Sequence, residues 1–256
     1  MISGTIEHAA GFLADAAAVP LVPPETVCSW GKTVVVAPHP DDESLGCGGA
    51  IALLSRFGLP ASVLFISDGT GSHPNSQQYP PPRLRDLRES EAREALTRLG
   101  AEASAPVFLR LPDGAVPGDA APGFSEAVTL CRAYLADCKP QTILLPWRRD
   151  PHPDHRAVSQ IIQAALSGYA GSPRLLEYPV WAWERAAPED VPQAHEAKAF
   201  RLDMEEAAAV KRLAIAAHKS QVTHMIDDDP QGFWLSPEVL AHFERPWEVY
   251  LEVLQW

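Results

Sequence analysis

Apolar residues in this 256-residue chain form short continuous runs that alternate with longer stretches of helical periodicity. Runs rich in β-branched and aliphatic residues predict buried strands, at Val34–Ala37, Ala61–Ser67, Val107–Leu111, Thr142–Leu145, Leu175–Trp183 and Trp247–Leu251. Apolar positions spaced three and four apart predict helices, at Ser44–Phe57, Arg83–Leu99, Phe124–Cys138, Arg156–Ser167 and Met204–Ser220. The alternation predicts an α/β fold, a Rossmann-like, doubly wound, mostly parallel sheet flanked by helices.

Residues 1–30 precede the first predicted strand and are interpreted as an N-terminal extension of one domain that spans residues 1–256. A short helix is expected at about Thr5–Ala18, followed by the proline-rich lead-in Pro20–Glu25. The extension either covers one face of the domain or contacts a neighbouring subunit of a homo-oligomer. The sequence leaves both alternatives open.

Composition and charge narrow the classes of partner. A formal net charge of -12 opposes binding to nucleic acid or to an anionic membrane, because both require a basic face. The apolar stretch 9–22 contains Asp15 and Pro20 and is too short to span a bilayer. No Lys or Arg precedes Lys32, so a secretory signal is not expected. Four cysteines without a CxxC pair favour a reduced, cytoplasmic protein.

Ionisable side chains gather directly after two of the predicted strands. The first strand leads into His39-Pro40-Asp41-Asp42-Glu43, and the fourth is followed by His152-Pro153-Asp154-His155. In a doubly wound sheet, ligands bind beyond the carboxyl ends of the strands, at a switch in strand order. Buried charges there must be paired, hydrated or bound to a cation, and His with carboxylate is a donor set that zinc prefers. The sequence therefore predicts a metal site at the C-terminal strand ends.

These two motifs resemble those of the LmbE-like/PIG-L superfamily of metal-dependent N-deacetylases, in the same order and at similar separation. Weaker matches follow at Arg88–Glu91 and His218–Gln221, and the resemblance covers roughly residues 31 to 221. It implies hydrolysis of an N-acetyl group from a small molecule, above all an amino-sugar conjugate of the N-acetylglucosamine type, with release of acetate.

The resemblance also implies a role for each residue of the motifs. The metal ligands are His39, Asp42 and His155. Zinc (Zn2+) is the expected ion, and iron(II) (Fe2+) fits the same donors. Asp41 is the expected general base and acid, with a helix cap as the alternative.

Two further residues of the second motif are expected to assist catalysis. His152 donates a hydrogen bond to the developing oxyanion. Asp154 fixes the tautomer of His152 and favours its protonated form. The alternative is a pair that only stiffens the loop. Glu43 is expected to orient backbone or neighbouring groups, and His218 to be structural.

Three residues are candidates for contacts with the substrate. Arg88 occupies a position that faces the site in the family, and a solvated helix residue is the alternative. His73 lies in a loop expected over the strand ends, where a surface histidine is the alternative. Trp147, together with Trp181 and Trp183, offers a stacking face for a sugar ring, and burial in the core is the alternative.

Two other functions remain open at this stage. An amidase acting on a thiol–sugar or other amide conjugate would use the same site but release a larger acid. A non-catalytic metal-binding or carbohydrate-binding protein would keep the scaffold without turnover. The loops 67–82 and 112–123 are expected to shape the pocket and to set the substrate.

Overall fold

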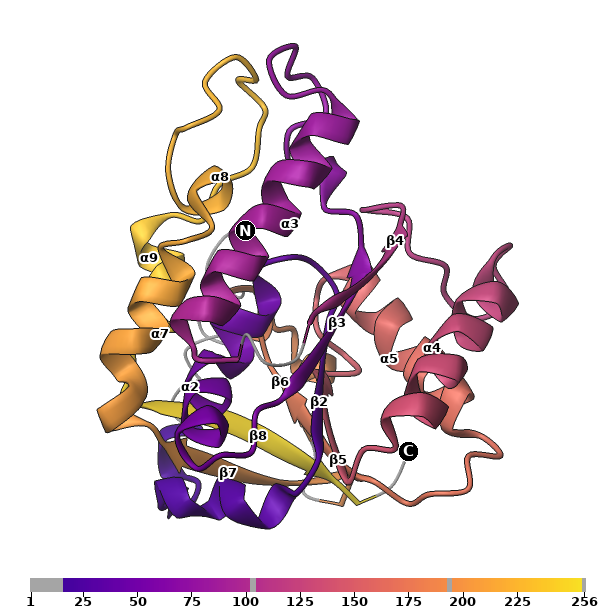
Figure 1. Cartoon of the computed structure of the whole chain (residues 1–256), viewed down its shortest axis with the longest axis vertical. Coiled ribbons are helices and arrows are strands. Elements are labelled where there is room, and N and C mark those ends of the chain that lie inside the picture. The colour runs from indigo at the N-terminus through magenta and orange to yellow at the C-terminus, as the bar shows by residue number, and fades with distance from the viewer. Residues whose placement is uncertain (1–15, 102–104, 193–194, 255–256) are drawn as a thin grey trace.

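A computed structural model describes residues 16–101, 105–192 and 195–254. Its centre is an eight-stranded sheet (Figure 1). The strands are β1 (Leu21–Val22), β2 (Thr33–Ala37), β3 (Ser62–Ser67), β4 (Val107–Leu111), β5 (Thr142–Pro146), β6 (Arg174–Tyr178), β7 (Ala197–Asp203) and β8 (Trp247–Val253). Their order is β1-β7-β8-β6-β5-β2-β3-β4, and neighbours are parallel except where β8 meets β6 and β7. The predicted mostly parallel sheet is confirmed.

Helices cover both faces of this sheet (Figure 1). On one face lie α2 (Asp42–Arg56), α3 (Pro81–Arg98) and α7 (Ala208–Ile215), with α7 in contact with the other two. On the opposite face α4 (Phe124–Cys138) packs against α5 (Pro153–Leu166). Shorter pieces are α6 (Ala182–Arg185), α8 (Lys219–Val222), α9 (Pro237–Leu240) and the 3-10 segments Pro24–Trp30, Thr70–Ser72, Pro188–Asp190 and Glu205–Ala207.

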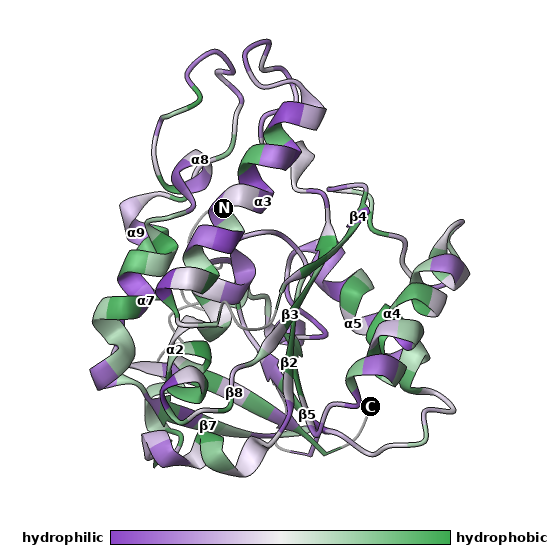
Figure 2. Cartoon of the chain, viewed as in Figure 1, coloured by the Kyte–Doolittle hydropathy of each residue, from purple (hydrophilic) through white to green (hydrophobic). Residues whose placement is uncertain are grey.

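Strand β2 is buried on both faces, as its run of β-branched residues predicts. Successive side chains point to opposite faces of a strand. Val35 and Ala37 therefore join the core beneath α2 and α3, whereas Val34 and Val36 join the core beneath α4 and α5. Figure 2 shows the hydrophobic residues of the central strands and of the helices that cover them.

The direction of winding reverses between β2 and β5. From β2 the chain proceeds to β3 and β4 on one side, and from β5 to β6 on the other. Strands β2 and β5 are parallel neighbours, so their carboxyl ends lie side by side at the switch in strand order. This topology brings together two motifs that lie more than 100 residues apart in the sequence.

Two predicted elements end differently in the structure. The strand expected at Leu175–Trp183 stops at Tyr178, because Pro179 follows and the chain then turns into α6. The helix expected at Met204–Ser220 is divided into a 3-10 turn, α7 and α8. It breaks near His218, whose side chain turns into the interior to meet a carboxylate.

Strand β7 was not predicted, because exposed residues interrupt its apolar pattern. It pairs with β8 on one side and with β1 on the other. The helix expected at about Thr5–Ala18 lies largely outside the described residues. From Leu21 to Trp30, however, the extension adds an edge strand and packs against α2, so this part covers the domain.

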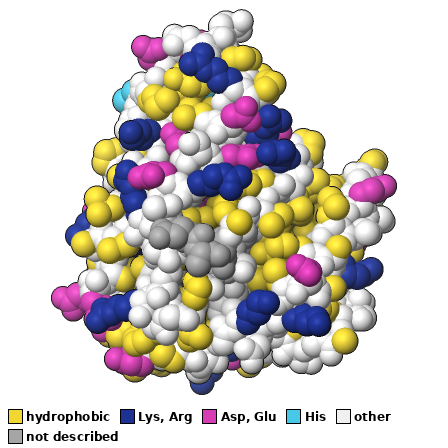
Figure 3. Space-filling model, in the orientation of Figure 1, with side chains coloured by type: hydrophobic (Ala, Val, Ile, Leu, Met, Phe, Trp, Pro, Cys, Tyr) yellow, Lys and Arg dark blue, Asp and Glu magenta, His cyan; other side chains and the backbone are white. Residues whose placement is uncertain are grey.

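Two surface properties bear on the predicted partners. None of the described helices has the length and apolar character needed to cross a membrane. On the face seen in Figure 3, acidic and basic side chains are interspersed rather than gathered into a block of one sign. That face therefore lacks the continuous basic field that nucleic acid requires.

Candidate metal centre

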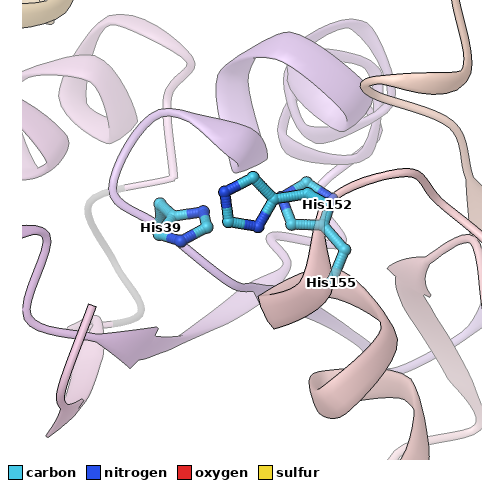
Figure 4. A group of neighbouring side chains, drawn as sticks. All are labelled: His39, His152 and His155. Atoms are coloured by element: carbon cyan, nitrogen blue, oxygen red, sulfur yellow. The ribbon is translucent and has the colours of Figure 1, made fainter. Parts of the chain in front are cut away.

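Both histidine motifs occupy the turns where a central strand gives way to a helix. β2 ends at Ala37, and α2 begins five residues later at Asp42. After β5, the side chain of His152 caps α5 by accepting a hydrogen bond from the backbone N–H of Asp154. Figure 4 shows the result: His39 from the first turn lies next to His152 and His155 from the start of α5.

The carboxylate of Asp42 lies between two imidazoles. Its Oδ2 is 3.1 Å from His39 Nδ1 and 3.3 Å from His155 Nε2. Donor atoms around a tetrahedral zinc ion with bonds near 2.0–2.1 Å lie about 3.3 Å apart. Burial opposes ionisation of Asp42, but His155 and His39 hold its pKa well below the usual range. The structure thus brings the three predicted metal ligands together.

His155 gives a test of whether these residues fit a cation. Its ring is fully buried, and neither ring nitrogen makes a hydrogen bond in the structure. Nδ1 lies 3.3 Å from Asp150 Oδ1, which leaves Nε2 facing Asp42. A buried nitrogen without a hydrogen-bond partner, beside an ionised carboxylate, fits the two-imidazole, one-carboxylate donor set of a catalytic zinc site.

Further potential donors lie around this set. Ring nitrogens of His39, His152 and His155 all lie within 4.8 Å of one another, and so do donor atoms of His39, Asp113 and Asp154. His39 belongs to both groups, and its Nε2 is 3.1 Å from Asp113 Oδ1 and from Asp154 Oδ2. The donor set is therefore wider than the three residues expected from the motifs.

The expected pairing of Asp154 with His152 is corrected by the structure. The Asp154 carboxylate contacts His39 and accepts backbone hydrogen bonds from Gly114 and Val116. His152 Nδ1 instead accepts the backbone N–H of Asp154, at 3.2 Å. Burial, with the nearby His155 and His39, lowers the pKa of His152 to about 4. The ring is thus held neutral, with its hydrogen on Nε2, rather than protonated.

Asp41 has a strained backbone, with φ 151° and ψ -28°. It occupies the N-cap position of α2, yet its side chain makes no capping hydrogen bond. Its N–H donates to Glu43 Oε2 at 2.9 Å, and Glu43 in turn is held by His218 Nε2 at 2.9 Å. This agrees with the expectation that Glu43 orients backbone, and it gives the buried His218 a structural role.

Arg88 holds the side chain of Asp41. The guanidinium is only 3% exposed, donates to Asp41 Oδ2 at 3.1 Å, and is fixed by the carbonyl oxygens of Pro40 and Gly69. Burial raises the pKa of Asp41 to about 6, with Arg88 acting in the opposite direction. Arg88 is therefore not a solvated helix residue, and it also lines the cavity described next.

A cavity of about 270 Å³ opens over these side chains. One wall is polar and carries His39, Asp41, Asp42, Asp113 and His152. The other lining residues named here come from the last third of the chain and form what we call the C-terminal wall: Val180, Trp181, Arg185, Gln221, Phe233 and Leu235. The loops expected to shape the pocket contribute Gly71 and Ser72 from one and Asp113 and Gly114 from the other.

Two of the expected substrate contacts lie outside the lining of this cavity. Trp147 is fully buried and donates its indole N–H to the carbonyl of Asp190 at 2.7 Å, so it occupies the core. His73 is neither on the surface nor in the cavity wall, and its ring contacts Ser72 Oγ at 3.1 Å. Trp181 is the tryptophan that lines the cavity.

Sequence reasoning missed two carboxylates of the site. Asp113 contacts His39 and accepts the N–H of Gly71; burial opposes its ionisation, but His39 and Arg88 keep its pKa below the usual range. Asp150 is fully buried and accepts the backbone N–H groups of His152, Val180 and Trp181. Asp113 follows β4 and Asp150 follows β5, so position at a strand end is the signal that would have identified both.

Comparison with known proteins gives a family match and several similar structures. The family model of PIG-L, GlcNAc-PI de-N-acetylase, matches residues 34–166, slightly over half of the chain. N,N'-diacetylchitobiose deacetylase from Pyrococcus horikoshii superposes with a TM-score of 0.68 at 19% identity, covering 90% of this chain and 86% of the other. The conserved protein TT1542 from Thermus thermophilus gives a TM-score of 0.55 at 30% identity, covering 74% and 79%.

One of the similar structures is that of an enzyme named for a different reaction. GalB, the 4-carboxy-2-hydroxymuconate hydratase from Pseudomonas putida KT2440, superposes with a TM-score of 0.58 at 22% identity, covering 73% of this chain and 78% of the other. The fold by itself therefore does not fix the chemistry. The match of the family model covers the turns that carry both histidine motifs and most of the polar wall. The chain belongs to the PIG-L family of metal-dependent N-deacetylases.

Proposed function

We propose that this protein removes the N-acetyl group from an amino-sugar conjugate of the N-acetylglucosamine type, releasing acetate and a free amine. One observation carries the proposal: the Asp42 carboxylate lies between His39 and His155, with Asp41 and His152 beside it in the same cavity wall. These are the groups that hydrolysis of an unactivated amide requires, namely a cation site, a proton acceptor and a donor to the oxyanion.

His39, Asp42 and His155 are the proposed ligands of a divalent cation, with zinc as the ion that the family and the donor set favour and iron(II) as an alternative. When bound, such an ion polarises a carbonyl and makes water more acidic. Asp150 Oδ1 faces His155 Nδ1 and so orients that imidazole for a donor role at Nε2.

Asp41 is the proposed general base. Arg88 and the Glu43–His218 pair fix its side chain and its backbone, and Asp41 lines the cavity beside the proposed cation site. Asp41 takes the proton from the attacking water and returns it to the nitrogen of the departing amine. Strain in its backbone is consistent with a residue whose placement matters more than its local stability.

His152 is the proposed donor to the oxyanion. Since its Nδ1 accepts a backbone N–H, the neutral ring can donate Nε2–H to the carbonyl oxygen as that oxygen gains charge. Donors of this kind typically contribute about 10²–10³ in turnover. His152 also lies within donor distance of the cation site, so its part in metal binding is tested directly below.

The C-terminal wall suits a sugar ring. Trp181 lines the cavity, with Phe233 in edge contact at 5.8 Å between ring centroids. Aromatic faces pack well against the C–H face of a pyranose, while the polar wall meets the acetamido group. The superposed chitobiose deacetylase is named for a substrate of this kind, which supports the assignment.

The test is a product assay on protein loaded with zinc. It is given a panel of N-acetylglucosamine conjugates, and released acids are identified by mass spectrometry alongside amine detection. Acetate in equal amount to the amine is expected. A larger acid would identify an amidase, and binding without turnover would identify a binding protein. Addition of water to an unsaturated acid, without release of an acid, would identify a hydratase.

Metal content separates the two possible donor sets. Purified Asp42→Ala and His152→Ala proteins are compared by mass spectrometry of the bound metal. Asp42→Ala is expected to lose the ion, whereas His152→Ala keeps it and loses turnover. Loss of the ion from His152→Ala alone would replace Asp42 by His152 in the coordinating set.

A further inference from the structure

The mouth of the cavity carries a cation for which the described residues provide no carboxylate. Arg185 is exposed, lines the cavity, and places its guanidinium 4.7 Å above the ring centre of Trp181. The other arginine of the cavity, Arg88, is occupied by Asp41 and by two backbone carbonyls. Arg88 Nε has no hydrogen-bond partner, but it is buried. Among the described residues, Arg185 is therefore the exposed cavity arginine with hydrogen-bonding capacity left for a ligand.

This acidic chain offers its arginines many possible carboxylate partners. The chain has an excess of acidic residues, with a formal net charge of -12, and several of its arginines form two-bond pairs with glutamates. Arg148 pairs with Glu177 and Arg174 with Glu252 in this way. A guanidinium stacked on an indole keeps its in-plane N–H groups available, which is the geometry that recognises carboxylates and phosphates.

Trp181 places Arg185 relative to the catalytic groups. The backbone N–H of Trp181 donates to the buried carboxylate of Asp150 at 2.9 Å, and its ring lies parallel to that of His152 at 6.4 Å between centroids. One turn later, the N–H of Arg185 donates to the carbonyl of Trp181 at 2.9 Å. The guanidinium is thus connected through one short helix to the carboxylate that also orients His155.

The cavity is consequently polarised. The carboxylates of Asp41, Asp42 and Asp113 lie beside the guanidinium of Arg88 and the proposed cation site, which offset their charge, whereas no carboxylate of the described residues offsets Arg185. An anionic group of a substrate is therefore attracted by the guanidinium of Arg185. The acetamido group is then directed toward the histidines, because the other end of the molecule is held at Arg185.

We propose that Arg185, stacked on Trp181, is an anion-recognition subsite, and that the substrate is an N-acetylated sugar carrying a carboxylate or phosphate remote from its acetamido group. The inference rests on the proposed deacetylase function and specifies its substrate class. A neutral N-acetyl sugar is then a poorer substrate than its anionic counterpart, with the difference in KM.

The experiment compares matched substrates on zinc-loaded protein. N-acetylglucosamine is the neutral probe, N-acetylglucosamine 6-phosphate and 1-phosphate are the phosphate probes, and N-acetylmuramic acid is the carboxylate probe. A charged hydrogen-bonded contact corresponds to a preference of about tenfold or more in kcat/KM. Arg185→Gln is expected to remove that preference through KM, and Arg185→Lys to restore part of it.

Arg93→Gln is the matched control. Arg93 also places its guanidinium over an aromatic ring, 4.7 Å from the centre of Phe108, but it lies outside the cavity lining. This variant is expected to keep the wild-type preference. Equal kcat/KM for neutral and anionic probes in the wild type, or a preference that survives Arg185→Gln, would overturn the subsite.

A binding measurement separates this inference from the proposed reaction. Calorimetry with the same four probes is carried out on Asp41→Asn protein, with and without Arg185→Gln. Anion binding that depends on Arg185, in a protein whose wild type releases no acetate, supports the subsite and overturns the deacetylase assignment. Acetate release without any preference for anions supports the deacetylase assignment and overturns the subsite. Which anionic probe binds most tightly distinguishes phosphate from carboxylate.

Discussion

The two walls of the cavity differ in origin and in character. The polar wall comes from short turns after β2, β4 and β5, inside the stretch that the PIG-L model matches. The C-terminal wall, with Trp181, Arg185 and Phe233, comes from residues 180–235, beyond the end of that match at residue 166. The family match therefore includes the residues of the polar wall, whereas the residues of the C-terminal wall lie outside it.

The walls also differ in how their side chains are held. On the polar wall, ionisable groups fix one another: Arg88 and Glu43 hold Asp41, and Asp154 holds His39. On the C-terminal wall, aromatic contacts predominate, such as Trp181 with Phe233 and Arg185 with Trp181. Substitutions in the first wall should thus reduce turnover, whereas substitutions in the second should change substrate affinity.

The largest effect is expected at the proposed base. Asp41→Asn keeps the shape of the side chain, and Asn tolerates positive φ better than most residues, but the amide cannot accept a proton. Turnover should fall about 10²–10⁴-fold with the metal content unchanged. Steady-state kinetics and metal analysis on the same preparation check this. Activity within tenfold of wild type would exclude the base role.

A large effect on stability, but not on recognition, is expected at Trp147. Removing this fully buried indole by Trp147→Ala leaves a cavity and an unpaired carbonyl at Asp190, for a loss of about 3–5 kcal/mol in the free energy of unfolding. Urea denaturation measures the loss. KM for the substrate should stay near the wild-type value. A rise in KM without a loss of stability would show that Trp147 contacts the substrate.

A buried ion pair outside the cavity lining should give stability a pH dependence. Arg148, from the turn after β5, pairs with the buried Glu177 of β6 at 2.8 Å. Burial raises the pKa of Glu177 from its ordinary value of 4.5 to about 7, with Arg148 opposing the rise. Between those values the folded state binds more protons than the unfolded state. The contribution of Glu177 to stability is therefore greatest below about pH 4.5 and declines by up to about 3 kcal/mol as the pH rises to about 7.

Urea midpoints of wild type and Glu177→Gln across pH 4.5–7.5 test this expectation. The difference between the two proteins should shift in favour of Gln as the pH rises. Glu252→Gln, which breaks the more exposed pair with Arg174, is the control and should cost no more than about 1 kcal/mol. A constant difference between wild type and Glu177→Gln at all pH values would show that Glu177 stays ionised.

The smallest effect is expected at Trp181. Trp181→Ala removes the aromatic face of the cavity and the platform of Arg185, so KM should rise about tenfold while kcat and metal content change little. Trp181→Phe keeps an aromatic face and should recover most of the affinity. A fall in kcat with KM unchanged would instead assign Trp181 to the reacting end.

Sequence pattern alone determined the central strands and the elements that follow them. The runs at Val34–Ala37 and Thr142–Leu145 are buried on both faces, so their composition identifies them as central parallel strands without tertiary information. The two histidine motifs were recognisable because their spacing is local and lies directly after those strands. The mostly parallel sheet and the meeting of His39, Asp42 and His155 followed from these two facts.

Only the tertiary structure decided which neighbours each group has. Asp113 joins the site because β4 lies beside β3 in the same sheet, and Asp154 turns to His39 because the loop after β4 supplies amides for its carboxylate. The sequence does not distinguish Trp147, Trp181 and Trp183, yet of these three tryptophans Trp181 lines the cavity. The physical reason is that a local pattern specifies periodicity and burial, whereas contacts between distant segments depend on strand order and on how the last third of the chain closes over the sheet.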